Sequence, residues 1–347
     1  MSRGQGVVRL AGAVLGLGGG IIAEHTLVGR RRRHDPESAE DLGGRQGARR
    51  RLLARPDGAR LQIEEAGPPA RSGIVFVHGS ALSAAVWHYQ MNGIRGHRCV
   101  FFDLRGHGLS QPKGAAPFTV GTLARDLRAV IREAGLDTVV IVGHSLGGMA
   151  ALQLLVEEPE PADVDVTGLV LAGATYGPAA ETLIGGAVIA RAERLIRRPF
   201  DMLGTQSARL DGLRRLNRAS DALFWSVTFA AFGPLPSAKQ VDFAYGLLAG
   251  TRADVIFDLV RCLRAFDVGK RLGEVTVPVL VVAGSHDRLT IPEASRYLAE
   301  HLADARLVVL DRCGHLPMLE RHSEFNEWLG DLADDSLGQA GLDDGNG

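Results

Sequence analysis

The sequence predicts an α/β protein built on a mostly parallel, doubly wound sheet with an inserted helical cap. Short apolar runs of strand length alternate with segments of helical length along most of the chain, and this alternation is typical of parallel sheets covered by helices. Polar, glycine-containing clusters follow several of the apolar runs, at the position where ligands bind in such sheets. Between residues 174 and 273 the alternation fails, so that segment is predicted to be the insertion.

The first predicted elements form a β-hairpin. The turn residues Pro56-Asp57-Gly58 separate two strand-like segments, Arg51–Arg55 and Ala59–Glu65, and Leu61 and Ile63 alternate with polar residues in the second. Continuously apolar runs, typical of strands covered on both faces, follow at Gly73–Val77, Cys99–Phe102, Thr138–Val142, Val166–Leu171, Val277–Val282 and Leu307–Leu310. Helices, several of them with apolar residues at helical spacing, are predicted over Ser83–Asn92, Thr119–Ala134, Leu146–Val156, Pro292–Leu302 and Ser323–Leu332.

These elements place residues 49–173 and 274–333 in one core and residues 174–273 in a cap. The cap segment is too long to be a loop within a compact domain. It contains seven of the twelve phenylalanines of the chain, namely Phe200, Phe224, Phe229, Phe232, Phe243, Phe257 and Phe266. One interpretation is an apolar lid over an apolar substrate. The other is that the rings form the cap's own core, and we expect this second role for at least half of them.

Residues 1–48 are predicted to form an arginine-rich extension outside the core. Residues 1–55 hold eleven Arg against five acidic residues. Leu10–Ala23 carries no charge, but its fourteen residues fall short of the ~20 that span a bilayer as a helix. Four interpretations stay open: a signal peptide with a poor cleavage site, a spanning anchor, a surface helix over residues 7–33 that binds anionic membrane, and an extension with no membrane role. The expected location is therefore cytoplasmic or membrane-associated.

Composition predicts flexible segments on both sides of the core. Residues 30–47 are polar and rich in arginine and glycine, which is typical of a linker. The end of the chain is acidic and glycine-rich, and we expect a disordered tail over residues 334–347.

Charge, cysteine content and glycine motifs argue against several classes of partner. The net charge of −1 gives no reason to expect nucleic acid. The cysteines, Cys99, Cys262 and Cys313, have neither metal-ligand spacing nor the pattern of a disulfide framework. No Gly-x-Gly-x-x-Gly follows a first strand, which argues against a dinucleotide site. We therefore expect no cofactor and no metal.

The strand Thr138–Val142 breaks into a helix at Ser145, with Gly143 and Gly147 two residues on either side. This is the G-x-S-x-G pattern of a nucleophile elbow. A serine at so sharp a turn requires a strained backbone, and glycines at the flanking positions remove side chains that would collide with the neighbouring strand and helix. The following helix directs its free N–H groups at the same place. Ser145 is thus the predicted nucleophile, the alternative being an ordinary strand-to-helix turn.

Two later loops supply the partners that a serine nucleophile needs. A serine hydroxyl is activated by an adjacent base, which is oriented by a third group. Asp287 follows the strand Val277–Val282, and His315 follows the strand Leu307–Leu310. The order Ser145, Asp287, His315 is the order expected with an elbow of this kind. We predict that His315 accepts the serine proton and that Asp287 orients the imidazole, although a helix cap and a loop histidine are the alternatives for each residue alone.

An oxyanion hole requires two preorganised N–H donors. The Leu146 N–H, directly after the nucleophile, is the first predicted donor. The Ser80 N–H, in the loop after the strand Gly73–Val77, is the second. The neighbouring Ala81 N–H stays open as an alternative to Ser80.

The motifs of the chain resemble those of the α/β-hydrolase family. Four of them match in the family's order: His78-Gly79-Ser80, Asp103-Leu104-Arg105-Gly106-His107-Gly108-Leu109-Ser110, Gly143-His144-Ser145-Leu146-Gly147-Gly148 and Cys313-Gly314-His315. The similarity covers roughly residues 50–333 and is greatest to bacterial esterases, lipases and cofactor-free haloperoxidases. It implies the α/β-hydrolase fold, and it implies that Asp103 and Arg105 support loop structure and are not catalytic. Serine at the elbow sets the chain apart from epoxide hydrolases and haloalkane dehalogenases, which use aspartate there.

Together these residues predict a serine hydrolase that cleaves a small-molecule carboxylic ester or thioester with an apolar acyl group, through an acyl-enzyme. An acyltransferase, a perhydrolase or a haloperoxidase would use the same three residues but pass the acyl group to an acceptor other than water. A binding protein that keeps the fold as a ligand receptor would have no need of Ser145, Asp287 and His315 together.

Overall fold

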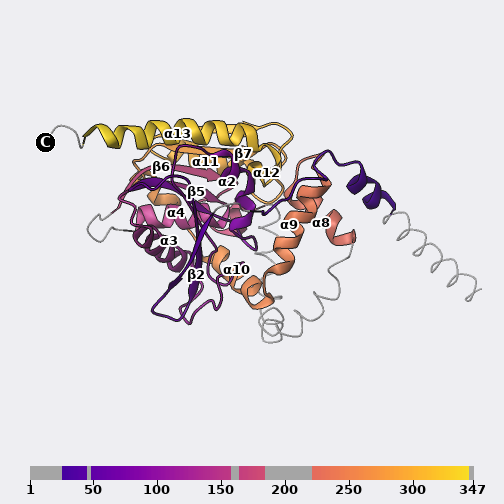
Figure 1. Cartoon of the computed structure of the whole chain (residues 1–347), viewed down its shortest axis with the longest axis horizontal. Helices are drawn as coiled ribbons and strands as arrows, with labels where there is room; N and C mark the ends of the chain where they lie inside the picture. The colour runs from indigo at the N-terminus through magenta and orange to yellow at the C-terminus, as the bar shows by residue number, and fades with distance from the viewer. Residues whose placement is uncertain (1–25, 45–47, 158–163, 184–220, 344–347) are drawn as a thin grey trace, which may run out of the picture.

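The computed structural model describes residues 26–44, 48–157, 164–183 and 221–343. Within these ranges an eight-stranded sheet crosses the molecule, with helices packed against it (Figure 1). Its strands are β1 (Arg49–Ala54), β2 (Arg60–Ala66), β3 (Ser72–Val77), β4 (Cys99–Phe102), β5 (Thr138–His144), β6 (Asp165–Ala172), β7 (Val279–Gly284) and β8 (Ala305–Leu310).

Neighbouring strands from β4 to β8 run parallel. The strand order is β1-β2-β4-β3-β5-β6-β7-β8, and every pair from β4-β3 to β7-β8 is parallel. β1 and β2 form the predicted antiparallel hairpin, and β2 joins β4 in antiparallel orientation. The α/β class with a mostly parallel sheet is thus confirmed, and the carboxyl ends of the parallel strands share one edge of the sheet.

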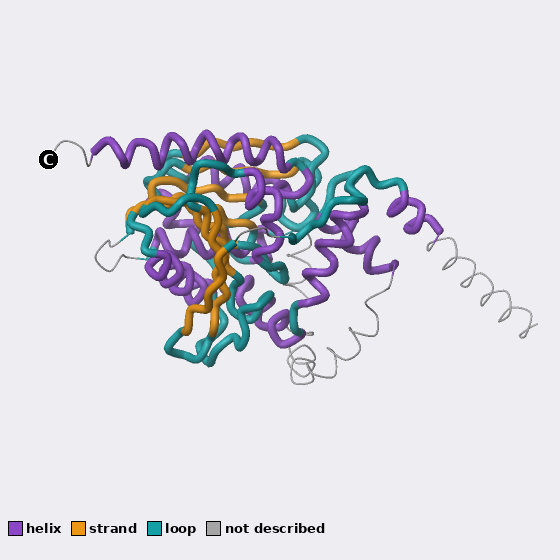
Figure 2. The backbone as a smooth tube through the Cα atoms, in the orientation of Figure 1, coloured by secondary structure: helices purple, strands orange, loops and turns teal. Residues whose placement is uncertain are grey.

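Helices cover both faces of the sheet (Figures 1 and 2). Those of the core are η1 (Ala84–Trp87), α2 (His88–Gly93), α3 (Val120–Ala134), α4 (Leu146–Val156), α11 (Pro292–His301), α12 (Pro317–Glu320) and α13 (His322–Asp343). Successive residues of β3 point to opposite faces: Val75 and Val77 enter a cluster beneath α3 and α4, whereas Ile74 and Phe76 enter one beneath α2 and α13. Each such fully buried side chain contributes about 1.5–3 kcal/mol, so both helical layers are held to the sheet mainly by apolar burial.

The segment predicted as the cap is helical where it is described, over residues 174–183 and 221–273, and we refer to it as the cap. Its elements are α5 (Ala179–Thr182), α8 (Asp221–Ala231), α9 (Ala238–Gly250), α10 (Ala253–Ala265) and the short helix η2 (Gly269–Glu274). Phe224, Phe232 and Phe266 are buried, whereas Phe229 is 67% exposed; Phe200 lies outside the described residues. Half of the six described phenylalanines are therefore buried, and they pack in the two clusters that also contain residues of the sheet.

The carboxyl-terminal helix is longer than the sequence predicts. α13 extends to Asp343, so the prediction of disorder from residue 334 is wrong as far as residue 343; residues 344–347 lie outside the described ranges. The physical reason is an apolar stripe at four-residue spacing, Phe325, Leu329, Ala333 and Leu337, which is buried against the sheet. The acidic residues between these positions dominate the composition, but they lie on the opposite face of the helix.

The segment before the core is also ordered where it is described. Residues 26–33 are helical, and the segment up to residue 44 packs on the cap and on α2. Asp35 accepts hydrogen bonds from Ser237 Oγ at 3.0 Å and from Lys239 N–H at 2.8 Å. Gly43 N–H donates to His88 Nδ1 at 3.2 Å. The prediction of a flexible linker over residues 30–47 is therefore wrong for residues 30–44, because polar side chains of this segment bind the cap.

Two of the four consecutive arginines, Arg31 and Arg32, contact the cap. Arg32 forms a bidentate pair with Asp242, at 2.7 and 2.8 Å. The Arg31 guanidinium lies over Phe224 and Trp225, at 5.7 and 5.4 Å from the ring centroids. The predicted membrane segment, residues 7–33, lies mostly outside the described residues. Among the helices that are described, none has the length and apolar character needed to cross a bilayer.

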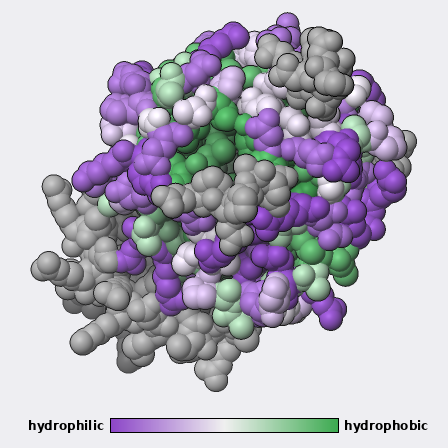
Figure 3. Space-filling view, turned by 90° about the vertical axis from the view of Figure 1, so that its left-hand side faces the viewer, coloured by the Kyte–Doolittle hydropathy of each residue, from purple (hydrophilic) through white to green (hydrophobic). Residues whose placement is uncertain are grey.

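Apolar surface is unevenly distributed on the face of the molecule in Figure 3. Hydrophobic side chains gather in a recessed area, and hydrophilic side chains border it. Apolar areas rimmed by polar side chains are typical of ligand-binding grooves and interaction surfaces when they are large.

We predict that Asp35→Ala loosens residues 26–44 from the cap. The change removes the acceptor for Ser237 and Lys239 at the start of α9, which costs about 1–2 kcal/mol. Limited trypsin digestion is expected to cleave the Arg30–Arg33 run several times faster in this variant. Asp41→Ala, at an exposed side chain, is the control and should match the wild-type rate; equal rates in both variants and the wild type would contradict the prediction.

Candidate active site

Ser145 occupies the sharp turn between β5 and α4. Its backbone dihedral angles are φ 49° and ψ −115°, a region that residues other than glycine rarely adopt. The Ser145 N–H donates to Ala172 O at 2.9 Å, and the Met149 N–H donates to Ser145 O at 3.1 Å. Strand β6 and helix α4 thus hold the strained elbow that the sequence predicts.

The glycines around Ser145 are required by close backbone contacts. A Cβ on Gly147 would lie 2.1 Å from Val77 O, and a Cβ on Gly143 would lie 2.5 Å from the Cα of a residue in α4. Neither contact could form without moving β3 or α4. A Cβ on Gly79 would lie 3.1 Å from Ser145 Cβ, so the loop after β3 also reaches the serine.

Asp287 and His315 come from the loops after β7 and β8 and bind each other. Asp287 Oδ2 lies 2.8 Å from His315 Nδ1, and both residues are buried. Asp287 Oδ1 accepts the N–H groups of Leu289 at 2.8 Å and Thr290 at 3.0 Å. Burial raises the pKa of Asp287, but His315 and these hydrogen bonds outweigh burial and hold the pKa below its usual value. An ionised Asp287 keeps the proton on His315 Nδ1 and leaves Nε2 as the basic nitrogen.

His315 lies beside the elbow. Its ring centroid is 4.8 Å from that of His144, and His144 Nε2 donates to His315 O at 2.9 Å. The Ser145 N–H donates to Ala172 O, and the next residue, Gly173, lies against the His315 ring: a Cβ on Gly173 would be 3.0 Å from His315 Nδ1. In the described chain no hydrogen bond joins Ser145 Oγ to the imidazole; such catalytic hydrogen bonds are often long before substrate binds.

The His78 ring orients the peptide that links Gly79 and Ser80. Because His78 Nε2 accepts a backbone N–H at 2.9 Å, its Nδ1 carries the proton and donates to Gly79 O at 2.8 Å. The C=O and N–H of a trans peptide point in opposite directions, so the Ser80 N–H is turned away from His78. The Ala81 N–H is already used, since it donates to His107 Nε2 at 3.2 Å. Of the two N–H donors that the sequence leaves open, Ala81 therefore already has an acceptor within the protein.

Two other buried histidines, His107 and His144, have lowered pKa values. Burial, together with the proximity of His78, lowers the pKa of His107 to about 3. Burial and then the charge of His315 lower the pKa of His144 well below its usual value. His107 and His144 form hydrogen bonds with backbone groups, whereas His315 pairs with the carboxylate of Asp287.

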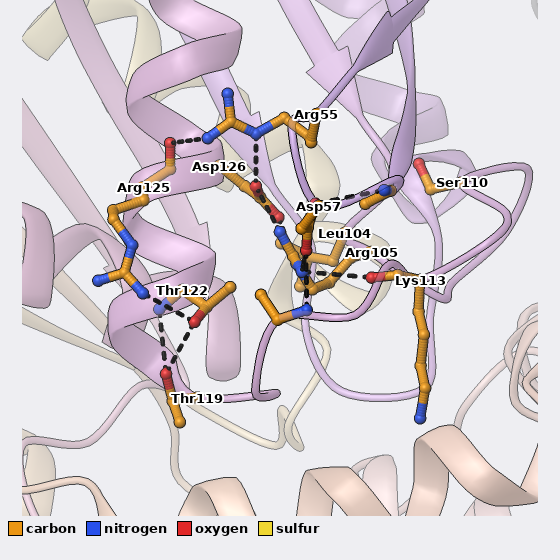
Figure 4. Close-up of polar contacts among 12 residues, drawn as sticks. Arg55, Asp57, Leu104, Arg105, Ser110, Lys113, Thr119, Thr122, Arg125 and Asp126 are labelled. Carbon is orange, nitrogen blue, oxygen red and sulfur yellow. Dashed lines mark hydrogen bonds and ion pairs between the residues drawn. The ribbon is translucent and has the colours of Figure 1, made fainter.

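A buried ion network anchors the loop after β4 (Figure 4). Arg105 binds Asp126 of α3 through two hydrogen bonds, at 2.6 and 2.9 Å. It also binds Asp57, in the β1–β2 turn, at 2.7 Å, and Arg55 binds Asp126 at 3.0 Å. Asp103 instead accepts backbone N–H groups at 2.7 Å from Ala84 and Leu109. These contacts support the loop-holding roles that the family resemblance implies for Asp103 and Arg105.

Sequence reasoning overlooks two residues at the His315 loop. His144 donates to the His315 carbonyl, and Glu320 accepts the Gly314 N–H at 2.8 Å. The position of His144 inside the elbow pattern could have indicated its role. Glu320 carries no such signal, because it lies on a short helix between two predicted elements, the strand Leu307–Leu310 and the helix Ser323–Leu332.

The cysteines contribute no exposed thiol to this region. Cys99, Cys262 and Cys313 are free and buried, and burial raises the pKa of Cys99 and Cys262 to about 12. Within the described residues, no group of three or more His, Cys, Asp or Glu side chains could hold a metal ion.

The chain matches known proteins over most of its length. A model of the alpha/beta hydrolase family matches residues 74–328. A relative from Variovorax paradoxus (strain S110), named as a candidate carbamate hydrolase, RutD, is 30% identical over 276 residues, which make up 78% of this chain and 95% of that protein. The 2-hydroxy-6-oxononadienedioate/2-hydroxy-6-oxononatrienedioate hydrolase 1 of Dechloromonas aromatica (strain RCB) is 27% identical, over 75% of this chain and 86% of its own.

Among solved structures, an esterase (EaEST) from Exiguobacterium antarcticum has a similar fold. The TM-score is 0.64 at 22% sequence identity, and the alignment covers 82% of this chain and 98% of the esterase. At that identity the likeness concerns the fold alone.

We predict that Asp126→Ala destabilises the protein by about 3 kcal/mol, because it leaves the buried Arg105 without its main partner. Urea unfolding followed by circular dichroism would measure the loss. Asp137→Ala removes a carboxylate that binds Arg71 on the surface, and as the control it should leave the midpoint nearly unchanged. Equal midpoints for both variants would show that the network does not stabilise the loop.

Proposed function

Because the chain belongs to the α/β-hydrolase family and is a hydrolase, we propose that it cleaves a carboxylic ester or thioester through an acyl-enzyme on Ser145. In this proposal His315 is the general base and acid, and Asp287 orients the imidazole. The backbone N–H groups of Ser80 and Leu146 bind the oxyanion. The substrate is a small molecule with an apolar acyl group.

The hydrogen bond between Asp287 and His315 is the observation that carries this proposal. A buried carboxylate bound to Nδ1 fixes the tautomer in which Nε2 is unprotonated. The ring lies next to His144, the residue before the serine. A histidine with only a structural role would not need an ionised partner that is itself held by two backbone N–H groups.

The first half of the reaction forms the acyl-enzyme. Ser145 Oγ attacks the carbonyl carbon as its proton passes to His315 Nε2, and the imidazolium is stabilised by Asp287. When the tetrahedral intermediate collapses, the bond to the leaving group breaks and His315 protonates the departing oxygen or sulfur. Water, deprotonated by His315, then attacks the acyl carbon and releases the acid, so that Ser145 regains its proton.

The backbone around Ser80 and Leu146 supports the oxyanion role. The Leu146 N–H belongs to the first turn of α4, where N–H groups lack partners in the helix. The bond from His78 to Gly79 O leaves the Ser80 N–H on the side of the peptide away from the His78 ring. The Ser80 hydroxyl is buried and has no hydrogen-bond partner among the described residues; an added bond to substrate would satisfy it.

Apolar side chains beside the Asp287 loop support an apolar acyl group. Phe229 of α8 is 67% exposed, and Leu289 is 39% exposed. Arg288, in the Asp287 loop, contacts Phe229 in two ways. Its Nη1 donates to Phe229 O at 2.9 Å, and its guanidinium lies 4.4 Å from the Phe229 ring centroid. Carbamates, named for the relative from Variovorax, have a carbonyl open to the same attack and belong among the substrates to be tested.

We predict that a fluorophosphonate probe labels Ser145 and that Ser145→Ala abolishes both labelling and ester hydrolysis. The removal of a serine nucleophile typically leaves only the residual rate of about 10³–10⁴ over water that binding and the oxyanion hole provide. Peptide mass spectrometry would locate the label. Ser285→Ala, at another serine in a loop after a strand, is the control and should label like the wild type; a label that persists in Ser145→Ala would remove the proposed nucleophile.

A panel of p-nitrophenyl esters from acetate to octanoate tests the acyl preference. We expect kcat/KM to rise by about tenfold or more with chain length, because each methylene that is buried contributes about 0.8 kcal/mol. A preference for acetate would contradict an apolar acyl site. Product analysis with added alcohol or peroxide would distinguish hydrolysis from acyl transfer, and hydrolysis is the expected outcome.

A further inference from the structure

Glu320, the last residue of α12, lies between the His315 loop and the cap. Its Oε1 accepts the Gly314 N–H at 2.8 Å, and its Oε2 accepts the Gly233 N–H at 2.7 Å. Gly314 directly precedes His315, and Gly233 is the second residue after the end of α8. One carboxylate thus binds the backbone of both segments.

The same two segments touch directly through their backbones. The His315 N–H donates to Ala231 O at 2.8 Å. A Cβ on Gly314 would lie 2.4 Å from Phe232 C, and a Cβ on Gly233 would lie 2.2 Å from Arg312 O. Because both glycines sit where no side chain fits, the contact is specific, and we call residues 231–233 and 313–315 with Glu320 the cap joint.

A carboxylate suits the cap joint because two N–H donors converge on one side chain. Each oxygen of an ionised carboxyl accepts one of them. A protonated carboxyl, or a glutamine amide, offers one full acceptor and turns a donor toward the other N–H. An N–H left facing another donor loses its hydrogen bond, at a cost comparable to that of an unsatisfied buried group.

We propose that Glu320 is a positioning residue that fixes His315 relative to the cap, and this inference rests on the proposed role of His315 as the base. In its ionised form Glu320 holds the His315 backbone at one end and the end of α8 at the other. Helix α8 carries Phe229, the apolar side chain proposed to border the acyl site. The cap joint therefore links the position of the base to the position of the substrate-binding helix.

The environment of Glu320 makes the cap joint sensitive to pH. Burial raises the pKa of Glu320 to about 7, although hydrogen bonds from Gly233, Gly314 and Cys313 oppose this. The carboxyl also borders a cavity of about 550 Å³, and the charged groups that face this cavity are Arg31, His34, Asp35, Glu37, Arg312 and Arg321. Near neutral pH the joint therefore passes between an ionised, doubly bound form and a protonated, weaker form.

The titration of Glu320 is expected to change the stability of the fold and the positioning of His315 in opposite directions. A carboxyl whose folded pKa is raised stabilises the fold when protonated, and this contribution is lost as pH rises through about 7. The proposed positioning changes in the other direction, since it strengthens as pH rises through the same value. A loss of activity on acidification is therefore not explained by unfolding through Glu320.

The test is Glu320→Gln, assayed on the full chain with a p-nitrophenyl ester that the wild type hydrolyses. We expect kcat to fall by about tenfold to a hundredfold with KM changed less than threefold, because small misplacements of a catalytic group have effects of this size. Glu324→Gln, at a half-exposed carboxylate that binds Arg321, is the matched control and should leave kcat unchanged. Glu320→Asp keeps the charge and should recover part of the loss.

The pH profile and hydrogen exchange provide readouts that a general loss of structure would not give. The acid limb of the wild-type kcat profile should be steeper than that of Glu320→Gln, because only the wild type carries the Glu320 carboxyl that titrates near pH 7. Deuterium exchange should increase in peptides that cover residues 231–233 and 313–315 and remain unchanged in α13.

The outcomes distinguish this inference from the proposed function. If Ser145 is not labelled, the proposed function fails, and the catalytic role of the cap joint fails with it. If exchange nevertheless rises in both peptides of Glu320→Gln, Glu320 still holds the two segments of the cap joint together. If the wild type is labelled and active but Glu320→Gln keeps its kcat, pH profile and exchange, the positioning role of Glu320 is overturned. A variant that does not fold is replaced by Glu320→Asp, for which the same changes in smaller degree are expected and their absence counts against the inference.

Discussion

The backbone of Ser145 is the constraint on which the rest of the structure depends. A residue with a side chain is held in a conformation that normally favours glycine, which costs about 1–3 kcal/mol. Contacts with the surrounding backbone offset this cost. A carbonyl of β6 accepts the Ser145 N–H, and α4 begins at the next residue. Strand β3 approaches so closely that only glycine fits at position 147. The parallel sheet is what brings these three elements to one edge.

Around this turn the structure divides the histidines by their partners. His78, His107 and His144 bind backbone groups, and for His107 and His144 burial also lowers the pKa, so that these rings organise loops. His315 has Asp287 as its partner. The same side-chain chemistry therefore serves two purposes, and the neighbouring acceptor, a carbonyl or a carboxylate, decides which one.

Much of the fold was predictable because its signals are local. Continuous apolar runs identify buried strands, as at Cys99–Phe102, and the glycine spacing around Ser145 identifies the elbow. Asp287 and His315 were predictable as residues after strands, but their mutual hydrogen bond depends on β7 and β8 lying side by side. That neighbourhood follows from the expected parallel order.

The rest depends on contacts between distant segments, which composition does not reveal. Residues 30–44 resemble a linker in composition, yet Asp35 binds the start of α9, about two hundred positions later. The acidic end of α13 resembles a tail, but Leu337 continues a buried stripe. Glu320 has no motif at all, and its role emerges only when Gly233 and Gly314 are seen to meet.

The most direct measurement is a crystal structure of the protein after phosphonylation by a fluorophosphonate. We expect a bond from phosphorus to Ser145 Oγ, with the phosphonyl oxygen about 2.7–3.1 Å from the N–H nitrogens of Ser80 and Leu146 and with His315 Nε2 within hydrogen-bond reach of Oγ. A phosphonyl oxygen directed away from both N–H groups, or an imidazole turned away from the serine, would contradict the proposed catalytic arrangement.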